Sequence, residues 1–171
     1  MATIQASDIK VYLSGGADNT DPNASLGGAI SNTELTDDAL HNLFAKVGAA
    51  EALAGSVKYR AVYVKNTHGT LTYEAAIAYI SSQTTSPDTS AKISVASEGK
   101  NATIQTIANE DTAPIGQVFS TADGTPNGLA LGDLAAGDYI GLWCERTVNA
   151  GAVAFGSDTL LVAARGESTS T

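Results

Sequence analysis

The sequence predicts an all-β fold, a β-sandwich of immunoglobulin-like or jelly-roll topology with one short helix in its N-terminal half. Three observations support this prediction. About eight short apolar segments recur at regular spacing, their side chains alternate between apolar and polar, and clusters of Gly, Asn, Asp and Pro separate them. The spacing of the segments fits both topologies, so the choice between them stays open.

The segment that contains the single Trp is the one around which the sheet is expected to form. Its side chains alternate between two apolar sets, with Tyr139, Gly141 and Trp143 on one face and Ile140, Leu142 and Cys144 on the other. A strand that is apolar on both faces is covered on both faces. The second sheet of a sandwich covers only one face, so the rest of the chain or another subunit must cover the other.

The turn before this strand has its own signature. Leu134, Gly137 and Tyr139 follow the order found in the tyrosine corner of Greek-key sandwiches. In that corner the tyrosine hydroxyl donates a hydrogen bond to backbone a few residues upstream. We therefore expect Tyr139 to hold the turn at residues 136–138.

The N-terminal third predicts one strand, one long loop and the helix. Alternating apolar residues predict a strand over residues 9–14, and a loop rich in Gly, Asn and Asp follows over residues 15–28. Thr36 is suited to cap a helix N-terminus, and apolar residues at i, i+3, i+4 and i+7 predict an amphipathic helix from Thr36 to Val47. This helix would plug an open face or end of the sheet, or cover the second face of the Trp143 strand.

The remainder of the chain predicts strands joined by turns. Val57–Lys65 and Leu71–Ser81 read as a β-hairpin, because turn-forming residues connect them. Shorter strands are expected over the ranges 91–97, 102–108, 117–120 and 159–165. The chain accordingly divides into a docking region at 1–56, a sandwich core at 57–166 and a mobile tail at 167–171.

Charge and composition narrow the range of partners. The formal net charge is −9, and the only local basic enrichment is Lys46, Lys58, Arg60 and Lys65, interpreted as solvated charges at the rim of the fold. An acidic chain without a basic run does not favour nucleic acid. The start has no secretory signal pattern, and no apolar run reaches membrane-spanning length. We therefore expect synthesis in a cytoplasm and no membrane partner.

The residues that could carry chemistry favour structural roles. His41 and His68 have no metal ligands or nucleophile at suitable spacing and are interpreted as solvated or capping side chains. The Asx-rich stretch 18–23 lacks the Gly and Glu of a calcium loop and is interpreted as turns. Cys144, the only cysteine, is expected to be a buried, inert thiol. The sequence predicts no catalytic, cofactor-binding or metal site, and therefore no enzyme.

Four segments together resemble virion structural proteins of tailed bacteriophages. They are residues 8–16 (DIKVYLSGG), 25–28 (SLGG), 59–69 (YRAVYVKNTHG) and 142–152 (LWCERTVNAGA). The resemblance covers most of the chain, and its motifs are structural, so it specifies a family better than a role. It implies a protein of the virion, and the chain's size adds the expectation of a capsid decoration (cement) protein that bridges major capsid subunits.

Such a protein would bind the major capsid protein or other virion proteins, through residues 4–47 and strand edges, and would self-associate into a closed cyclic oligomer. Deletion of the residues before Val57 is expected to leave a folded sandwich that no longer binds capsids. Two alternatives remain. One is a neck, tail or head-fibre domain that recognises host glycans through aromatic loop residues, and the other is a head-completion or tail component present in few copies.

Overall fold

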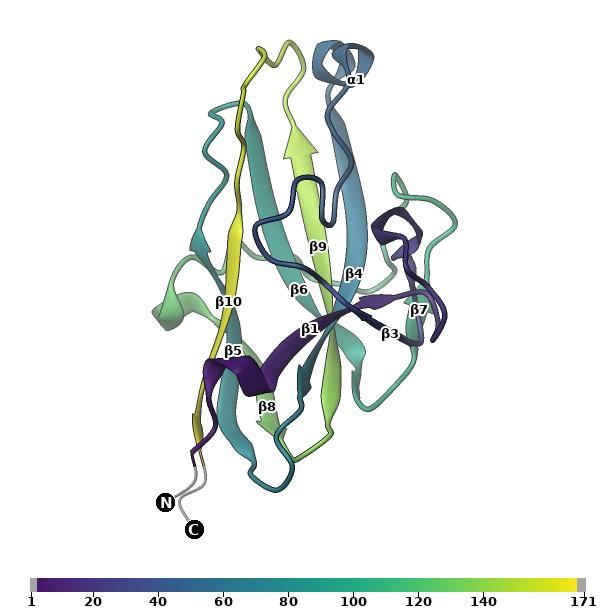
Figure 1. The fold of residues 1–171 in the computed structure, drawn as a ribbon. Coiled ribbons are helices and arrows are strands. Elements are labelled where there is room, and N and C mark those ends of the chain that lie inside the picture. Colours follow the sequence, from purple (N-terminus) through teal and green to yellow (C-terminus); the bar gives the residue numbers. More distant parts are fainter. Residues whose placement is uncertain (1–2, 169–171) are drawn as a thin grey trace.

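The computed structural model describes residues 3–168 and has the all-β fold that the sequence predicts (Figure 1). One α-helix, α1 (Ala49–Ala54), and the 3₁₀ turns η1 (Ala6–Asp8), η2 (Pro22–Ala24) and η3 (Thr125–Asn127) accompany the strands. The strands are β1 (Ile9–Ser14), β2 (Gly27–Gly28), β3 (Ile30–Glu34), β4 (Ser56–Asn66), β5 (Tyr73–Ser82), β6 (Thr89–Lys100), β7 (Ile104–Thr106), β8 (Leu129–Leu134), β9 (Tyr139–Val148) and β10 (Leu161–Ser168).

These strands form two main antiparallel sheets and one small sheet. The larger sheet has the order β3-β1-β4-β9-β6, and the second has the order β10-β5-β8. The strand that contains Trp143 is β9, and it pairs with β4 over ten residues, from Ser56 opposite Val148 to Lys65 opposite Tyr139. The prediction that this segment is central to the fold is confirmed.

The main core lies between the two larger sheets. One face of β9 supplies Ile140, Leu142 and Cys144 to it, and both sheets contribute the rest. Its buried members are Val62, Val64, Tyr73, Ala76, Ala78, Ile80, Ala91, Ile93, Ala122, Leu131, Leu134, Ile140, Leu142 and Cys144. Burial of this apolar surface is the dominant stabilising contribution to a fold of this kind.

The other face of β9 has a core of its own, here called the outer core. Its buried members are Ala61, Tyr63, Ala96, Ile104, Ile107 and Trp143, and Trp143 is 0 % exposed. The third sheet, β2 with β7, and the loops beside it provide the cover, since Leu26, Ile30 and Phe119 pack against these residues. Of the two ways to cover this face that the sequence left open, the chain itself is the one observed.

Tyr63 fastens this cover to the large sheet. Its hydroxyl donates to the carbonyl oxygen of Gly28 at 2.6 Å and accepts from the backbone N–H of Ile104 at 3.1 Å. Gly28 belongs to β2 and Ile104 to β7, so one phenol joins both strands of the small sheet to β4. These two hydrogen bonds offset the cost of removing the hydroxyl from water.

The predicted helix from Thr36 to Val47 is wrong. This segment is a series of turns in which Asp38 and His41 have φ of 56° and 58°, outside the right-handed helical region. The helix present, α1, begins just beyond it. The apolar periodicity instead reflects packing of Leu43 and Phe44 against the main core. The segment therefore closes part of the sandwich, which is the role expected of the helix, but it does so without regular secondary structure.

The predicted hairpin is also wrong, because β4 and β5 belong to different sheets. Their connection is a corner centred on the buried Asn66. Its Nδ2 donates to the carbonyl oxygens of Leu71 and Leu134 at 2.9 and 2.8 Å, and its Oδ1 accepts from the N–H of His68 at 3.0 Å. The turn-forming residues thus lie where the chain passes from one sheet to the other. The alternating pattern of the two flanking strands is the same for this connection and for a hairpin.

The predicted tyrosine corner is not formed. The hydroxyl of Tyr139 lies 3.4 Å from the carbonyl oxygen of Asn101, in a different turn. Asp138 holds the turn instead, since its carboxylate accepts from the N–H of Ala135 at 3.0 Å and from Nδ2 of Asn101 at 2.7 Å. The hydrogen bond from Asn101, with help from Lys100, lowers the pKa of Asp138.

The N-terminal segment is built into the sandwich. β1 and β3 are strands of the same sheet as β4, and Leu13 in β1 is buried. The docking role of residues 1–56 stays a prediction, but this segment shares a sheet with residues 57–166. At the other end β10 continues to Ser168, so residues 167–168 of the expected tail are strand; residues 169–171 lie outside the described range.

Candidate interaction surfaces

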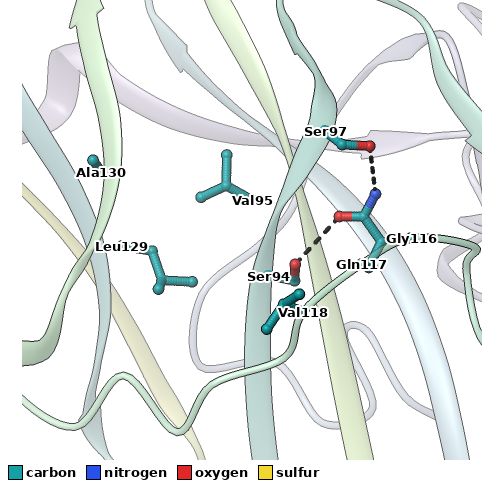
Figure 2. A pocket seen from close by; sticks show the side chains of 8 residues that line it. All are labelled: Ser94, Val95, Ser97, Gly116, Gln117, Val118, Leu129 and Ala130. Carbon is teal, nitrogen blue, oxygen red and sulfur yellow. Dashed lines mark hydrogen bonds between the residues drawn. The ribbon is translucent and has the colours of Figure 1, made fainter.

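A groove opens on the side of the sandwich where β6 and β8 face each other without a strand between them (Figure 2). Its volume is about 310 Å³. Val95 and Leu129, which line it, are half-buried residues packed against the main core. The groove is lined by Ser94, Val95, Ser97, Gly116, Gln117, Val118, Leu129 and Ala130. It is therefore a place where the edge of the core meets solvent.

Two glutamine side chains hold the loop at the rim of this groove. Gln117 accepts a hydrogen bond from the Ser94 hydroxyl at 3.2 Å and donates one to the Ser97 hydroxyl at 3.0 Å (Figure 2). The side-chain amide of Gln105 pairs with both backbone groups of Ile115, at 2.7 and 2.9 Å. Residues 115–118 are thus fixed against β6 and β7 by side chains.

The same loop carries two large apolar side chains into solvent. Ile115 is 85 % exposed and Val118 is 82 % exposed. A loop fixed by four hydrogen bonds keeps these side chains in place, so little conformational entropy would be lost when they are buried against a partner. The groove lining has no charged side chain, and its few polar groups are hydroxyls and an amide. This chemistry suits apolar protein side chains better than a charged ligand.

A second exposed apolar surface lies at the end of the molecule that carries α1, here called the α1 end (Figure 1). Leu53 of α1 is 77 % exposed, and Val153 of the β9–β10 loop is 67 % exposed. The two segments are joined, since the N–H groups of Gly151 and Ala152 both donate to the carbonyl oxygen of Ala52, at 2.9 and 3.0 Å. Phe155 of the same loop is also exposed.

A network of ion pairs, here called the charge network, anchors α1 to the large sheet. Glu51 of α1 pairs with Arg146 at 2.9 Å and with Lys58 at 3.5 Å, and Lys58 reaches Glu110 at 2.7 Å. Glu110 also pairs with Arg60, which is buried. The interpretation of Lys58 and Arg60 as solvated charges is therefore wrong. Glu110 lies 50 residues from Arg60 in the sequence, so no local pattern assigns this ion pair.

Both carboxylates of the charge network have shifted pKa values. Burial alone raises the pKa of Glu51, but the hydrogen bond from Ser56 and the charges of Arg146 and Lys58 outweigh it and leave that pKa below its usual value. Glu110 behaves in the same way, with hydrogen bonds from Lys58 and Arg60 outweighing burial. Both groups are accordingly charged at neutral pH.

The ring of Phe44 completes the charge network. Its centroid lies 5.7 Å from the guanidinium carbon of Arg60 and 5.0 Å from that of Arg146. Arg146 also donates to the carbonyl oxygen of Ala45 at 2.8 Å. These cation–π and hydrogen-bond contacts fix the segment between β3 and α1 to the sheet.

The residues singled out in the sequence are not brought together. His41 is exposed in a turn, whereas Nδ1 of His68 accepts from the N–H groups of Thr70 and Leu71, which confirms the capping interpretation for His68. Cys144 is a buried thiol, as expected, and burial raises its pKa to about 12. Asp21 accepts from the N–H of Asn23 at 2.9 Å, so the Asx-rich stretch does form turns.

Sequence reasoning missed the groove and the α1 end. The available signal was Ile115 between Pro114 and Gly116, which mark a loop. Val118 was expected in a strand over residues 117–120, but only Ser120 pairs there, in an isolated bridge with Ile93. Across residues 3–168, no three His, Cys, Asp or Glu side chains are grouped so that they could hold a metal ion. Within the same range, no helix is long and apolar enough to span a bilayer.

Comparison of the chain with protein-family models, with curated proteins and with solved structures found no match.

Proposed function

We propose that the protein is a structural virion protein of a tailed bacteriophage, and specifically a capsid decoration protein that bridges major capsid subunits. The family follows from the resemblance of four segments of the sequence to virion structural proteins. The α1 end supports the docking role, because it presents apolar side chains on a part of the molecule that the charge network holds in place. The partner is a major capsid subunit of the assembled shell.

The exposed surface meets the physical requirements of a decoration protein. A shell offers many equivalent sites, so a modest contact repeated over neighbouring subunits gives firm attachment through multivalency. Leu53 and Val153 would be the apolar anchors of that contact, since anchors of an interface are side chains that become fully desolvated. The net charge of −9 keeps the remaining surface soluble and away from the packaged genome.

Binding to capsids that lack the protein tests this proposal. Purified protein is mixed with such particles, and the bound fraction is measured by co-sedimentation over a range of concentrations. We expect Leu53→Asp and Val153→Asp each to weaken binding by at least about tenfold, because truncation of an interface anchor costs more than about 1.4 kcal/mol. Ile115→Asp is the matched control, since Ile115 is 85 % exposed, is held against β7 by Gln105, and lies outside residues 1–56.

Unchanged binding by both α1-end variants would contradict the docking surface. The copy number per virion, measured by quantitative mass spectrometry of purified particles, tests the role itself. Hundreds of copies fit a decoration protein, whereas about six to twelve fit the alternative of a neck, tail or head-fibre component in a closed ring. Absence of the chain from the particles would contradict both.

A further inference from the structure

We propose that the groove between β6 and β8 is a self-association surface, in which Ile115 and Val118 of one copy bind against Val95 and Leu129 of a second copy. The inference does not rest on the proposed function, because it concerns the purified chain alone. The observation that carries it is the fixed, outward presentation of two apolar side chains directly beside a groove that exposes the edge of the main core.

The first argument is the arrangement of the surface. Val118 lines the groove, and Ile115 directly precedes Gly116, which also lines it, so an exposed apolar side chain and the recess share one face. A two-fold interface uses the same patch on both copies and must be complementary to itself. A face that carries both the projecting side chains and the recess meets this condition. The projecting side chains of each copy would fill the groove of the other copy.

The second argument is charge. Each copy carries a net charge of −9, so most pairs of identical faces would repel each other. The groove is lined by Ser, Val, Gly, Gln, Leu and Ala side chains, and none of them is ionised. Identical neutral faces can approach without like-charge repulsion at the contact. This favours a second copy as the occupant of the groove. A cationic partner would instead bind to the acidic parts of the surface outside the groove.

The third argument is the way the loop is held. Gln105 and Gln117 together make four hydrogen bonds that fix residues 115–118, although the side chains of Ile115 and Val118 contact little within their own copy. Ordering a loop costs conformational entropy, and an ordered loop has met that cost before it binds. Gln105 and Gln117 are therefore positioning residues for the contact.

The contact is expected to be of modest strength. The residues that line the groove, together with Ile115, form a smaller patch than the roughly 20–30 residues per side of a standard interface. We therefore expect association in the micromolar range, with monomers at the lowest concentrations. Sedimentation velocity of the purified full chain, from about 1 μM to about 1 mM, covers that range.

Variants assign the association to the groove. Val118→Asp and Ile115→Asp each introduce a charge that would have to enter the apolar groove of the second copy. We expect each variant to weaken association by at least about tenfold. Both side chains are exposed, so the variants should fold, which the unfolding midpoint checks. Leu53→Asp is the matched control and should associate like the unmodified chain. Gln105→Ala, which keeps both apolar side chains but frees the loop, should weaken association to a smaller extent.

Site-directed cross-linking tests the geometry. The single native thiol, Cys144, is buried, so an introduced cysteine provides the reactive thiol. A mixture of Val118→Cys and Ala130→Cys chains, treated with a short bismaleimide, should give the mixed dimer in preference to either homodimer, because Val118 of one copy faces the groove of the other.

A chain that stays monomeric up to about 1 mM would overturn the proposal. Association that survives both Val118→Asp and Ile115→Asp, or that Leu53→Asp abolishes, would overturn it as well. Capsid binding by a strictly monomeric chain would leave the proposed function standing and remove only this inference. A chain that self-associates but fails to bind capsids would contradict the proposed function and leave this inference standing.

Discussion

At Gly27 the backbone conformation and the packing both exclude a side chain. Its φ is +93°, and a Cβ placed on it would lie 1.8 Å from the carbonyl oxygen of Gln105 in β7. Gly16 has a similar φ of +99° but open space around it. The pair therefore separates two effects that usually occur together, the strain of a left-handed backbone and a steric clash.

We expect Gly16→Ala to lower the free energy of unfolding by about 1–2 kcal/mol, the cost of the backbone conformation alone. Gly27→Ala should cost more than about 3 kcal/mol, because β2 and β7 must also move apart and uncover the outer core. Urea denaturation of both variants measures the difference. Equal effects would show that β2 and β7 are not held as closely as described here.

Asn66 supports a second prediction. Asn66→Asp keeps the shape of the side chain but removes the Nδ2 donor from two carbonyl oxygens, those of Leu71 and Leu134. A buried acceptor without a donor costs about 1–3 kcal/mol, so we expect a loss of about 3 kcal/mol in the free energy of unfolding. Asn42→Asp removes an exposed amide hydrogen bond and is the control; a loss as large as that of Asn66→Asp would contradict the role of the corner.

At the scale of elements, the charge network decides how α1 responds to acid. The pKa of Glu51 is lowered in the folded chain, so its contribution to stability is present above its unfolded pKa of about 4.3 and is lost as the pH falls through the folded value. The same sign holds for Glu110. Both carboxylates thus add to the loss of stability below about pH 4.

Glu51→Gln should therefore flatten the pH dependence of stability. We expect the variant to be less stable than the unmodified chain at pH 7, where Arg146 and Lys58 lose an ionised partner, and to lose less stability between about pH 5 and pH 3. Chemical denaturation at a series of pH values measures the slope. A slope equal to that of the unmodified chain would show that Glu51 does not contribute in this way.

Elements were predictable where local pattern alone determines them. The strand around Trp143, with two apolar faces, was recognised from the alternation of its side chains. The helix from Thr36 to Val47 was not predictable, because the same apolar spacing also suits a loop that packs Leu43 and Phe44 against a core. The corner at Asn66 resembled a hairpin, since a local sequence of turn residues does not encode which sheet the next strand joins.

At the scale of the whole molecule, the position of β1 and β3 in the large sheet changes what truncation should do. Deletion of the residues before Val57 removes both strands and β2, and with them part of each core. We expect the remaining chain to lack a cooperative thermal transition, in contrast to the expectation from sequence that a sandwich would survive. Circular dichroism on heating measures this. A sharp transition near that of the full chain would support the division predicted from the sequence, in which residues 57–166 form a sandwich core by themselves.

The interaction surfaces could be predicted only in part. That some segment must cover the second face of β9 followed from its apolar residues, but its identity depended on contacts between residues far apart, such as Tyr63 with Gly28 and Ile104. The exposure of Ile115 and Val118 depends on where Gln105 and Gln117 find partners, which no local pattern encodes.

The two ends of the described chain meet, since the N–H of Ile4 donates to the hydroxyl of Ser168 at 3.1 Å. They meet at the opposite end of the molecule from α1 (Figure 1). A fluorescent protein or a peptide antigen genetically fused to either terminus would therefore be carried on the side facing away from the α1 end. The same proximity makes the chain a candidate for circular permutation, with a short linker joining the old termini.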